Sequence, residues 1–415
     1  MARILIRAGK SPFEAVDPLT CHHKNLIASN SGNILFAQSV YKALSTSDNE
    51  LICNQYKVSR DADFINNNYD AFVIPLANAF RPSFSKQLDA LTALIRQLKI
   101  PCVVVGVGAQ TNLKLDMLRS SPIDDSVKNF VSAVLDRSTS IGVRGELTRE
   151  YLARLGFTAV DTIGCPSMYL HGGRIDVRKT REKIGPESSV SMNLTRGMNE
   201  PTWQLFRRTW KRYPKLTYVA QDRSDFEYLY WGRPIIDGIK KGDAFPSKIN
   251  HPLYTSDRIR MYVDAKTWLD GMKAFEFAFG TRIHGNVFAL LAGTPAVVLA
   301  HDSRTLELSQ FYDIPHIRTD DINEDTDAST LFEAADFANL MTRLPSRFEF
   351  FKSFLEKNGL KHMYDGSDAE VRFERRLETT KLPPPIRPIL SCGPKELSAR
   401  IASLHQDIER LIQNH

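Results

Sequence analysis

One apolar run constrains the fold of this chain more than any other feature. Residues 100–108 read IPCVVVGVG and lack the polar–apolar alternation of a strand that has one face in water. A strand covered on both faces is typical of a parallel sheet, because the helices that connect parallel strands lie on both sides of the sheet. The run therefore predicts an α/β protein with a mostly parallel sheet.

The residues around this run alternate between strand-like and helix-like segments. The expected strands are 2–7, 50–56, 70–76, 140–144 and 160–164, and the expected helices are 32–44, 87–98, 126–138 and 146–156. Gly156 stands where a glycine commonly terminates a helix. The alternation predicts a doubly wound sheet, whose ligands bind beyond the carboxyl ends of the strands.

A second series of the same kind follows residues 172–189, which combine glycines, a proline and charges with few apolar side chains. Its expected strands are 189–195, 216–222, 275–280 and 295–300, and its expected helices are 203–213, 262–275 and 285–293. Residues 230–252 are expected to form an irregular connection of the kind that often binds substrates. For 415 residues we expect an N-terminal domain at 1–173, a second domain at 174–330, and a helical extension at 331–415 with a proline-rich break at 382–390.

The end of this extension carries an apolar stripe at spacings of three and four residues. The stripe consists of Leu397, Ile401, Leu404, Ile408 and Leu411. It is shorter than the three or four heptads that usually define a coiled coil. Two interpretations stay open, namely packing of the helix on its own domain and a homodimer formed through it.

The composition favours a soluble globular protein and excludes several classes. Hydrophobic residues make up 42% and charged residues 25%, and no apolar run approaches the ~20 residues of a membrane span. The net charge of +6 comes without a block of like charges, so we expect no nucleic-acid partner. Five scattered cysteines without a CxxC pair favour a reducing, cytoplasmic location, and the sequence has no HExxH motif to suggest a metal.

The clearest functional pattern lies in TRIHG, residues 281–285, between an expected strand and an expected helix. A helix N-terminus offers free N–H groups and attracts anions. Arg282 adds a planar fork that suits carboxylate or phosphate, and His284 can exchange a proton near neutral pH. Arg304 follows the next strand and would face the same sheet edge. The three residues predict an anion site.

Two further segments fit the same logic. Arg144 ends the expected strand 140–144, so its side chain would point into the crevice from the first domain. The loop formed by Ser31, Gly32 and Asn33 precedes a helix, although it does not follow the GxGxxG pattern and is a weak phosphate signal.

Two blocks of this sequence resemble the polysaccharide pyruvyl transferases. They are VRGELTREYLARLGF followed by IGCPSM, and TRIHGNVFALLAGTPAVVLAHDSR, with support from the SGN loop and from DAFVIPL and IPCVVVGVGAQ. The resemblance covers roughly residues 1–320. It implies a fold similar to that of GT-B glycosyltransferases, with two Rossmann-like domains that face each other across a cleft.

The implied activity is the transfer of pyruvate from phosphoenolpyruvate to a sugar of a cell-surface polysaccharide or its precursor, as a ketal and without a further cofactor. In this resemblance Arg144, Arg282, His284 and Arg304 hold the donor, and His284, Arg282 and Arg144 are the catalytic set, with His284 as acid or base. Residues 1–173 contribute Arg144 and form the acceptor side with the Ser31–Asn33 loop, and 174–330 bind the donor. If the acceptor is a lipid-linked saccharide, the protein would work at the inner face of the membrane.

The sequence also departs from the family pattern. Arg304 stands where members often carry lysine, Asn33 replaces the acidic residue of a Gly-Asp pair, and PLANAF at 75–80 replaces a glycine triplet. Two alternatives therefore stay open. One is a GT-B-like glycosyltransferase that uses a nucleotide sugar, with Glu307 as the candidate ribose ligand. The other is a non-catalytic saccharide-binding or assembly protein.

Overall fold

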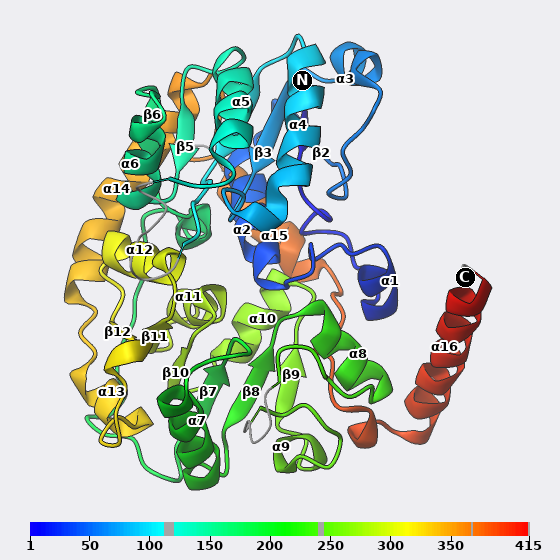
Figure 1. Cartoon of the computed structure of the whole chain (residues 1–415), viewed down its shortest axis with the longest axis vertical. Coiled ribbons are helices and arrows are strands. Elements are labelled where there is room, and N and C mark those ends of the chain that lie inside the picture. Colours follow the sequence, from blue (N-terminus) through cyan, green and yellow to red (C-terminus); the bar gives the residue numbers. More distant parts are fainter. Residues whose placement is uncertain (112–119, 240–244, 367, 414–415) are drawn as a thin grey trace.

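A computed structural model describes residues 1–111, 120–239, 245–366 and 368–413. Two α/β units face each other, the N-terminal unit at the top of Figure 1 and the second unit below it. All strand pairings described within the three sheets are parallel. The arrangement is a GT-B-like pair of Rossmann-like units followed by a mostly helical C-terminal region.

The N-terminal unit has the strand order β2-β1-β3-β4, and a parallel bridge between Val107 and Val143 links this sheet to the pair β5-β6. Its strands are β1 Ala2–Ile6, β2 Asn49–Cys53, β3 Ala71–Pro75, β4 Cys102–Val105, β5 Ile141–Val143 and β6 Val160–Thr162. Its helices are α1 Pro18–His23, α2 Gly32–Leu44, α3 Ala62–Asn68, α4 Ser85–Gln97, α5 Asp124–Leu135 and α6 Glu146–Arg154, with the short 3-10 helices η1 Pro82–Phe84 and η3 Pro166–Tyr169.

The apolar run at 100–108 forms β4 and is covered on both faces, as predicted. Val103 and Val105 belong to the core on the α2 side, whereas Cys102 and Val104 belong to the core shared with α4 and α5. All four side chains are fully buried. A strand of this kind needs apolar residues at every position, which explains the absence of alternation.

The second unit has the strand order β12-β11-β10-β7-β8-β9. Its strands are β7 Val190–Asn193, β8 Thr217–Ala220, β9 Ile259–Met261, β10 Phe277–Gly280, β11 Ala296–Ala300 and β12 His316–Arg318. Its helices are α7 Glu200–Arg212, α8 Arg223–Trp231, α9 Pro252–Thr255, α10 Ala265–Met272, α11 Ile283–Leu291 and α12 Ser303–Tyr312, with the 3-10 helix η4 Thr319–Asp321.

Each sheet has one point where its connections change direction. In the N-terminal sheet this switch point lies between β1 and β3, and in the second sheet it lies between β7 and β10. Loops diverge there and leave a crevice outside the carboxyl ends of the strands, where open α/β sheets bind ligands. The topology therefore provides two candidate binding regions.

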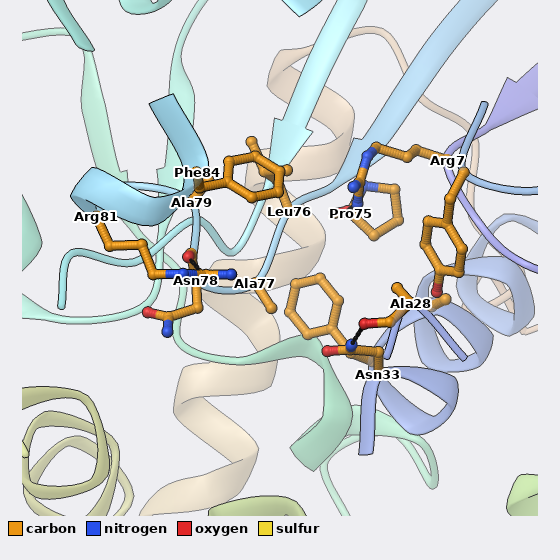
Figure 2. A pocket seen from close by; sticks show the side chains of 13 residues that line it. Arg7, Ala28, Asn33, Pro75, Leu76, Ala77, Asn78, Ala79, Arg81 and Phe84 are labelled. Carbon is orange, nitrogen blue, oxygen red and sulfur yellow. Dashed lines mark hydrogen bonds between the residues drawn. The ribbon is translucent and has the colours of Figure 1, made fainter. Parts of the chain in front are cut away.

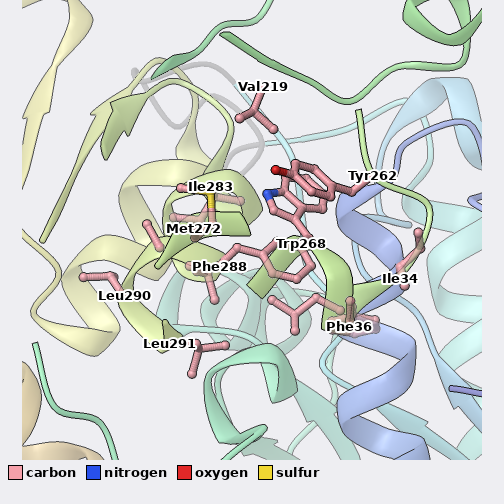
Figure 3. Close-up of a cluster of buried hydrophobic side chains, with 14 of the residues drawn as sticks. Ile34, Phe36, Val219, Tyr262, Trp268, Met272, Ile283, Phe288, Leu290 and Leu291 are labelled. Atoms are coloured by element: carbon pink, nitrogen blue, oxygen red, sulfur yellow. The ribbon is translucent and has the colours of Figure 1, made fainter. Parts of the chain in front are cut away.

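One core cluster extends through both units. Helix α2 of the first unit contacts α10 and α11 of the second, and Figure 3 shows Ile34 of α2 and Trp268 of α10 in the same buried cluster. The Trp268 ring stacks on Phe288 at a centroid distance of 4.0 Å. Shared apolar burial of this kind holds the two sheet edges against each other.

The C-terminal region packs on both units. It contains α13 Ala328–Ala334, α14 Ala338–Lys357, α15 Ala369–Thr379, the 3-10 helix η5 Ile389–Ser391 and α16 Pro394–Gln413. Helix α14 returns to the first unit, where the Asn358 side chain that follows it accepts hydrogen bonds from the backbone N–H groups of Thr139 and Ser140 at 3.1 and 3.2 Å. The buried Lys42 of α2 forms ion pairs with Glu370 and Glu374 of α15.

Helix α16 contacts α8, and one member of the predicted stripe, Leu404, is partly buried and packs against the core cluster. Arg400 and Ser403 are buried, and Ser403 Oγ accepts a hydrogen bond of 3.0 Å from Trp231 Nε1. Ile401 and Ile408 are exposed, whereas the side chain of Leu411 lies outside the described residues. Among the described residues, no helix combines the length and the apolar character that a membrane crossing requires.

Most predicted strands and helices are present within a few residues of their expected bounds, and Gly156 follows the last residues of α6 with a φ of 95°. Helices α1, α3, α8, α9 and α12 and the three-residue strands β9 and β12 were not predicted. Helix α12 was missed because Ser303, Thr305 and Ser309 are polar residues on its buried side, so the helix has no apolar stripe of the usual kind. Within the predicted irregular stretch 230–252, residues 240–244 lie outside the described residues.

Candidate anion-binding active site

The second switch point positions the TRIHG segment. Strand β10 ends at Gly280, whose φ is 155°, and a Cβ added there would lie 1.9 Å from the carbonyl oxygen of Asn193 in β7. Only glycine permits this close approach. Asn193 Oδ1 then accepts a hydrogen bond of 2.8 Å from the backbone N–H of Arg282. These contacts fix the start of α11 against the end of β7.

His284 lies in the first turn of α11 and contacts the N-terminal unit. A Cβ added to Gly32 would lie 2.7 Å from His284 Cβ, so the SGN loop packs directly on this side chain. His284 Nε2 lies 3.9 Å from the sulfur of Cys165. Burial, followed by the positive charges of Arg144 and Arg304, lowers the pKa of His284 to about 3. The imidazole is therefore neutral at pH 7.

Arg144 is the most unusual residue of the site, because its side chain is fully buried and 0% of its surface is exposed. Its Nε, Nη1 and Nη2 atoms have no hydrogen-bond partner among the described residues. Gly108 leaves room for it, since an added Cβ would lie 2.5 Å from Arg144 Cδ. Burial lowers the pKa of Arg144, and Cys165, the largest opposing influence, raises it. An unpaired buried guanidinium is costly, so this arrangement calls for an anion.

Arg304 reaches the same region from the second residue of α12. Its Nη2 lies 3.2 Å from Asp302 Oδ2, while its Nε is buried without a partner in the described part of the chain. Asp302 is itself held in place, because Oδ2 accepts a hydrogen bond of 3.1 Å from Gln110 and Oδ1 accepts one of 2.8 Å from the Thr305 N–H. The carboxylate orients Arg304 and leaves part of its fork available.

Arg282 is held differently, because its guanidinium forms an ion pair with Asp222. Its Nε also donates to the Leu194 carbonyl oxygen at 3.4 Å, and Asn30 donates to the other oxygen of Asp222 at 3.2 Å. Arg282 and Arg304 together act on His301, whose pKa burial lowers to about 4. The structure thus brings Arg144, His284 and Arg304 together and places Arg282 beside them in a paired state.

The loop of Ser31, Gly32 and Asn33 connects the two units next to His284. The Ser31 N–H donates to the Gln221 carbonyl oxygen at 2.9 Å, and Ser31 Oγ is buried without a partner among the described residues. The Asn33 side chain donates to the carbonyl oxygens of Ile27 and Ala28 at 3.3 and 3.2 Å. Asn33 also lines a pocket of the N-terminal unit.

Two further arginines of this region, Arg81 and Arg7, were not predicted as site residues from the sequence. Arg81 lies close enough to Arg304, Arg144 and Arg7 for their charges to act on it, and burial together with these charges lowers its pKa to about 10. Arg7 follows β1 as Arg144 follows β5, so the strand-end pattern that identified Arg144 could have identified it. Arg81 follows a strand end only after a loop, and the sequence offers no comparable signal for it.

Glu307 does not have the role that the glycosyltransferase alternative assigned to it. Its Oε1 accepts hydrogen bonds from the backbone N–H and the hydroxyl of Thr148 at 2.9 and 3.2 Å. This carboxylate of α12 therefore caps the N-terminus of α6 in the other unit. Burial raises the pKa of Glu307 to about 7. A side chain held in this contact is not placed to bind a ribose.

The fold is GT-B-like, and the facing sheet edges of its two units carry several arginines. The family model for polysaccharide pyruvyl transferase matches residues 30–303, which is more than half of the 415 residues. The chain therefore belongs to the polysaccharide pyruvyl transferase family, a family of transferases. The matched segment includes Arg81, Arg144, Arg282 and His284, and it ends one residue before Arg304.

Two solved structures illustrate what the chain is similar to. A UDP-GlcNAc 2-epimerase from Methanocaldococcus jannaschii, in complex with UDP-GlcNAc and UDP, has 12% identity and a TM-score of 0.42, with 91% of this chain and 99% of that chain covered. A UDP-GlcNAc 2-epimerase from Neisseria meningitidis bound to UDP-GlcNAc has 9% identity and a TM-score of 0.40, with 91% and 99% covered. No curated protein matches the chain. None of these comparisons identifies its substrate.

Proposed function

We propose that this protein transfers the pyruvyl group of phosphoenolpyruvate to two hydroxyls of a sugar, which forms a ketal in a cell-surface polysaccharide or its precursor. The observation that carries the proposal is Arg144, a fully buried guanidinium whose nitrogens lack partners among the described residues. Its planar fork of N–H donors fits a carboxylate or a phosphate. A bound anion would offset the cost of burying this charge.

Phosphoenolpyruvate matches the charge of the whole cluster. It carries a carboxylate and a phosphate, and the site offers Arg144 and the partly available Arg304, with Arg81 close enough for all three charges to interact. Like charges at short range repel each other, and a multiply charged anion between them turns the repulsion into attraction. A nearly neutral ligand would leave the repulsion in place.

The reaction conserves atoms and charge without an additional reagent. The methylene carbon of phosphoenolpyruvate gains a proton, one sugar hydroxyl attacks the adjacent carbon, and a second hydroxyl displaces the phosphate. The proton of one hydroxyl ends on the new methyl group, and the proton of the other leaves with the phosphate. The arginines hold the carboxylate and the phosphate so that the reacting carbon is oriented toward the sugar.

His284 is our candidate for proton transfer. A neutral imidazole can take a proton from the attacking hydroxyl, and burial together with Arg144 and Arg304 lowers the pKa of His284 to about 3, which favours the neutral form at pH 7. A donor anion between Arg144 and Arg304 would cancel the charges that lower this pKa, so the imidazolium becomes accessible once the donor is bound. His284 can then deliver the proton to the methylene carbon.

Calorimetric titration of the full chain with phosphoenolpyruvate and with UDP-glucose tests the proposal. We expect binding of phosphoenolpyruvate and, in the presence of a saccharide acceptor, release of inorganic phosphate. Binding and turnover of UDP-glucose without binding of phosphoenolpyruvate would instead support the glycosyltransferase alternative. If neither donor binds, the non-catalytic alternative gains support and the proposal fails.

A further inference from the structure

A pocket occupies the switch point of the N-terminal sheet, outside the ends of β1 and β3. Arg7 lines it from β1, the residues from Pro75 to Ala79 line it from β3, and Asn33 and Phe36 line it from α2. Its cavity volume is about 90 Å³, below the ~300 to 1,000 Å³ typical of pockets that enclose a whole ligand, so it has room for one group of a ligand. We call it the Arg7–Arg81 pocket, and Figure 2 shows these two arginines on opposite sides of it.

The lining of the Arg7–Arg81 pocket is cationic. No aspartate or glutamate is among the described residues that line it. Arg7 Nη1 donates to the Pro75 carbonyl oxygen at 3.3 Å, and its guanidinium lies 5.0 Å from the Tyr56 ring centre. The Arg81 guanidinium lies 5.2 Å from the Phe84 ring centre and donates to the Asn78 carbonyl oxygen. Carbonyl groups and aromatic rings orient both arginines without neutralising them.

The backbone around this pocket is strained at two lining residues. Ala28 has a φ of 47° and Tyr56 has a φ of 58°, a region that residues with a side chain rarely adopt. Such a backbone conformation is unfavourable and persists only where the surrounding structure imposes it. The strained conformation of Tyr56 accompanies the position of its ring beside Arg7.

The pocket adjoins the donor arginines but is separated from them by one side chain. Phe36 lines the pocket, and the Arg144 guanidinium lies 6.0 Å from the Phe36 ring centre. Arg81 is within electrostatic range of both Arg7 and Arg144. A molecule in the pocket would therefore lie next to the donor, with Arg81 near both and Arg144 on the donor side of Phe36.

The pocket also offers groups that suit sugar hydroxyls. Asn78 Oδ1 is buried and has no hydrogen-bond partner among the described residues, although its amide nitrogen donates to Gln110. A buried acceptor of this kind gains from a hydroxyl donor. Cations together with an amide acceptor favour a ligand that carries both an anionic group and hydroxyls.

We infer that the Arg7–Arg81 pocket binds an anionic group of the acceptor saccharide, either a phosphate or a carboxylate, and presents the acceptor hydroxyls toward the donor. This inference rests on the proposed function for the role of the bound molecule as acceptor. The acceptor is thus an anionic saccharide, and Arg7 determines specificity for its charge. Phe36 separates the acceptor anion from the donor anion.

The test measures binding by calorimetry on the full chain with four probes: glucose 1-phosphate, glucuronic acid, glucose and phosphoenolpyruvate. The variants are Arg7→Gln, Arg7→Lys and, as a matched control, Arg60→Gln, which removes the charge of an exposed arginine that does not line the pocket. Circular dichroism verifies that each variant is folded. If Arg7→Gln does not fold, Arg7→Lys and the probe comparison on the wild type still decide the question.

We expect the wild type to bind at least one anionic sugar about tenfold or more tightly than glucose. Arg7→Gln should lower the affinity for that anionic sugar by roughly 10- to 100-fold, the range expected for a lost charge-assisted hydrogen bond. Arg7→Lys should cause a smaller loss, because it keeps the charge without the planar fork. The affinity of Arg7→Gln for phosphoenolpyruvate should stay within about twofold of the wild-type value. Arg60→Gln should change the affinity for neither ligand.

Two results would overturn the inference. In the first, neither anionic sugar binds more tightly than glucose. In the second, Arg7→Gln lowers the affinity for phosphoenolpyruvate as much as it lowers the affinity for the anionic sugar. Tighter binding of glucose 1-phosphate assigns the site to a phosphate, and tighter binding of glucuronic acid assigns it to a carboxylate. If the wild type binds an anionic sugar through Arg7 but does not bind phosphoenolpyruvate, the proposed function fails while the anionic-saccharide site stands.

Discussion

The two facing sheet edges differ in whether their arginines form ion pairs with carboxylates. On the edge of the second unit, Arg282 pairs with Asp222, Arg196 pairs with Asp225 at 2.8 Å, and Arg304 pairs with Asp302. On the N-terminal edge, Arg144 has no hydrogen-bond partner among the described residues, and Arg7 and Arg81 contact carbonyl oxygens and aromatic rings. The paired edge resembles a preorganised support, and the unpaired edge carries the charge that a ligand must satisfy.

His284 lies between these edges, and its substitution should have the largest effect on turnover. We expect His284→Gln to lower phosphate release from phosphoenolpyruvate by about 10²- to 10⁴-fold, the usual contribution of a general acid or base. The affinity for phosphoenolpyruvate should change only a few-fold, because the arginines remain. Steady-state assays with a saccharide that the wild type accepts, together with calorimetry, separate the two effects. Undiminished turnover would remove His284 from the mechanism.

Arg144 gives the sharpest test of the unpaired edge. Arg144→Gln should lower the affinity for phosphoenolpyruvate by about 100-fold, which corresponds to roughly 3 kcal/mol of lost charge-assisted hydrogen bonding. The same variant should be at least as stable as the wild type in thermal unfolding, since it removes a buried charge that has no hydrogen-bond partner in the described part of the chain. Arg149→Gln, on the exposed side of α6, serves as the control. A large loss of stability in Arg144→Gln would mean that the residue is structural.

A substitution of Asp222 tests the paired edge. Here we expect a loss of stability and only a small change in donor affinity, the opposite of the expectation for Arg144→Gln. Asp222→Asn removes the charge partner of the partly buried Arg282, so we expect a stability loss of about 1–3 kcal/mol in denaturant unfolding. Phosphoenolpyruvate affinity should change less than in Arg144→Gln. Glu146→Gln disrupts an exposed ion pair and should have almost no effect on stability. Equal loss of donor affinity in Asp222→Asn and Arg144→Gln would erase the distinction between the edges.

The pH dependence of donor binding should be the smallest effect. Because a bound anion raises the pKa of His284 from about 3, the complex binds more protons than the free protein. Phosphoenolpyruvate affinity should therefore rise as the pH falls toward the pKa of His284 in the complex. Calorimetry at several pH values measures this slope for the wild type and for His284→Gln. Identical slopes in the two proteins would show that His284 does not sense the donor.

Much of the fold and part of the site could be predicted from the sequence. The run at 100–108 predicted a doubly covered parallel strand, and the strand-end positions of Arg144 and His284 placed them at the facing edges. The state of each arginine could not be predicted, because it depends on partners distant in the sequence. Asp222 precedes a helix that the apolar pattern did not reveal.

Glu307 is a second residue whose charge partner could not be predicted from the sequence. Its position after β11 suggested a ligand contact, yet the folded chain brings it to the N-terminus of α6, 159 residues away. A carboxylate and a free helix N-terminus attract each other wherever the fold juxtaposes them. Strand periodicity reports which edge a residue occupies, and only the tertiary structure reports whether its charge is already satisfied.

The most direct test of the account is the pKa of His284 measured by NMR with and without phosphoenolpyruvate. Its signals are assigned by comparison with His284→Gln. The account predicts a pKa near 3 in the free protein and a clear upward shift when the donor anion binds between Arg144 and Arg304. A His284 pKa that stays unchanged at saturating phosphoenolpyruvate would contradict the claim that Arg144 and Arg304 form the donor site.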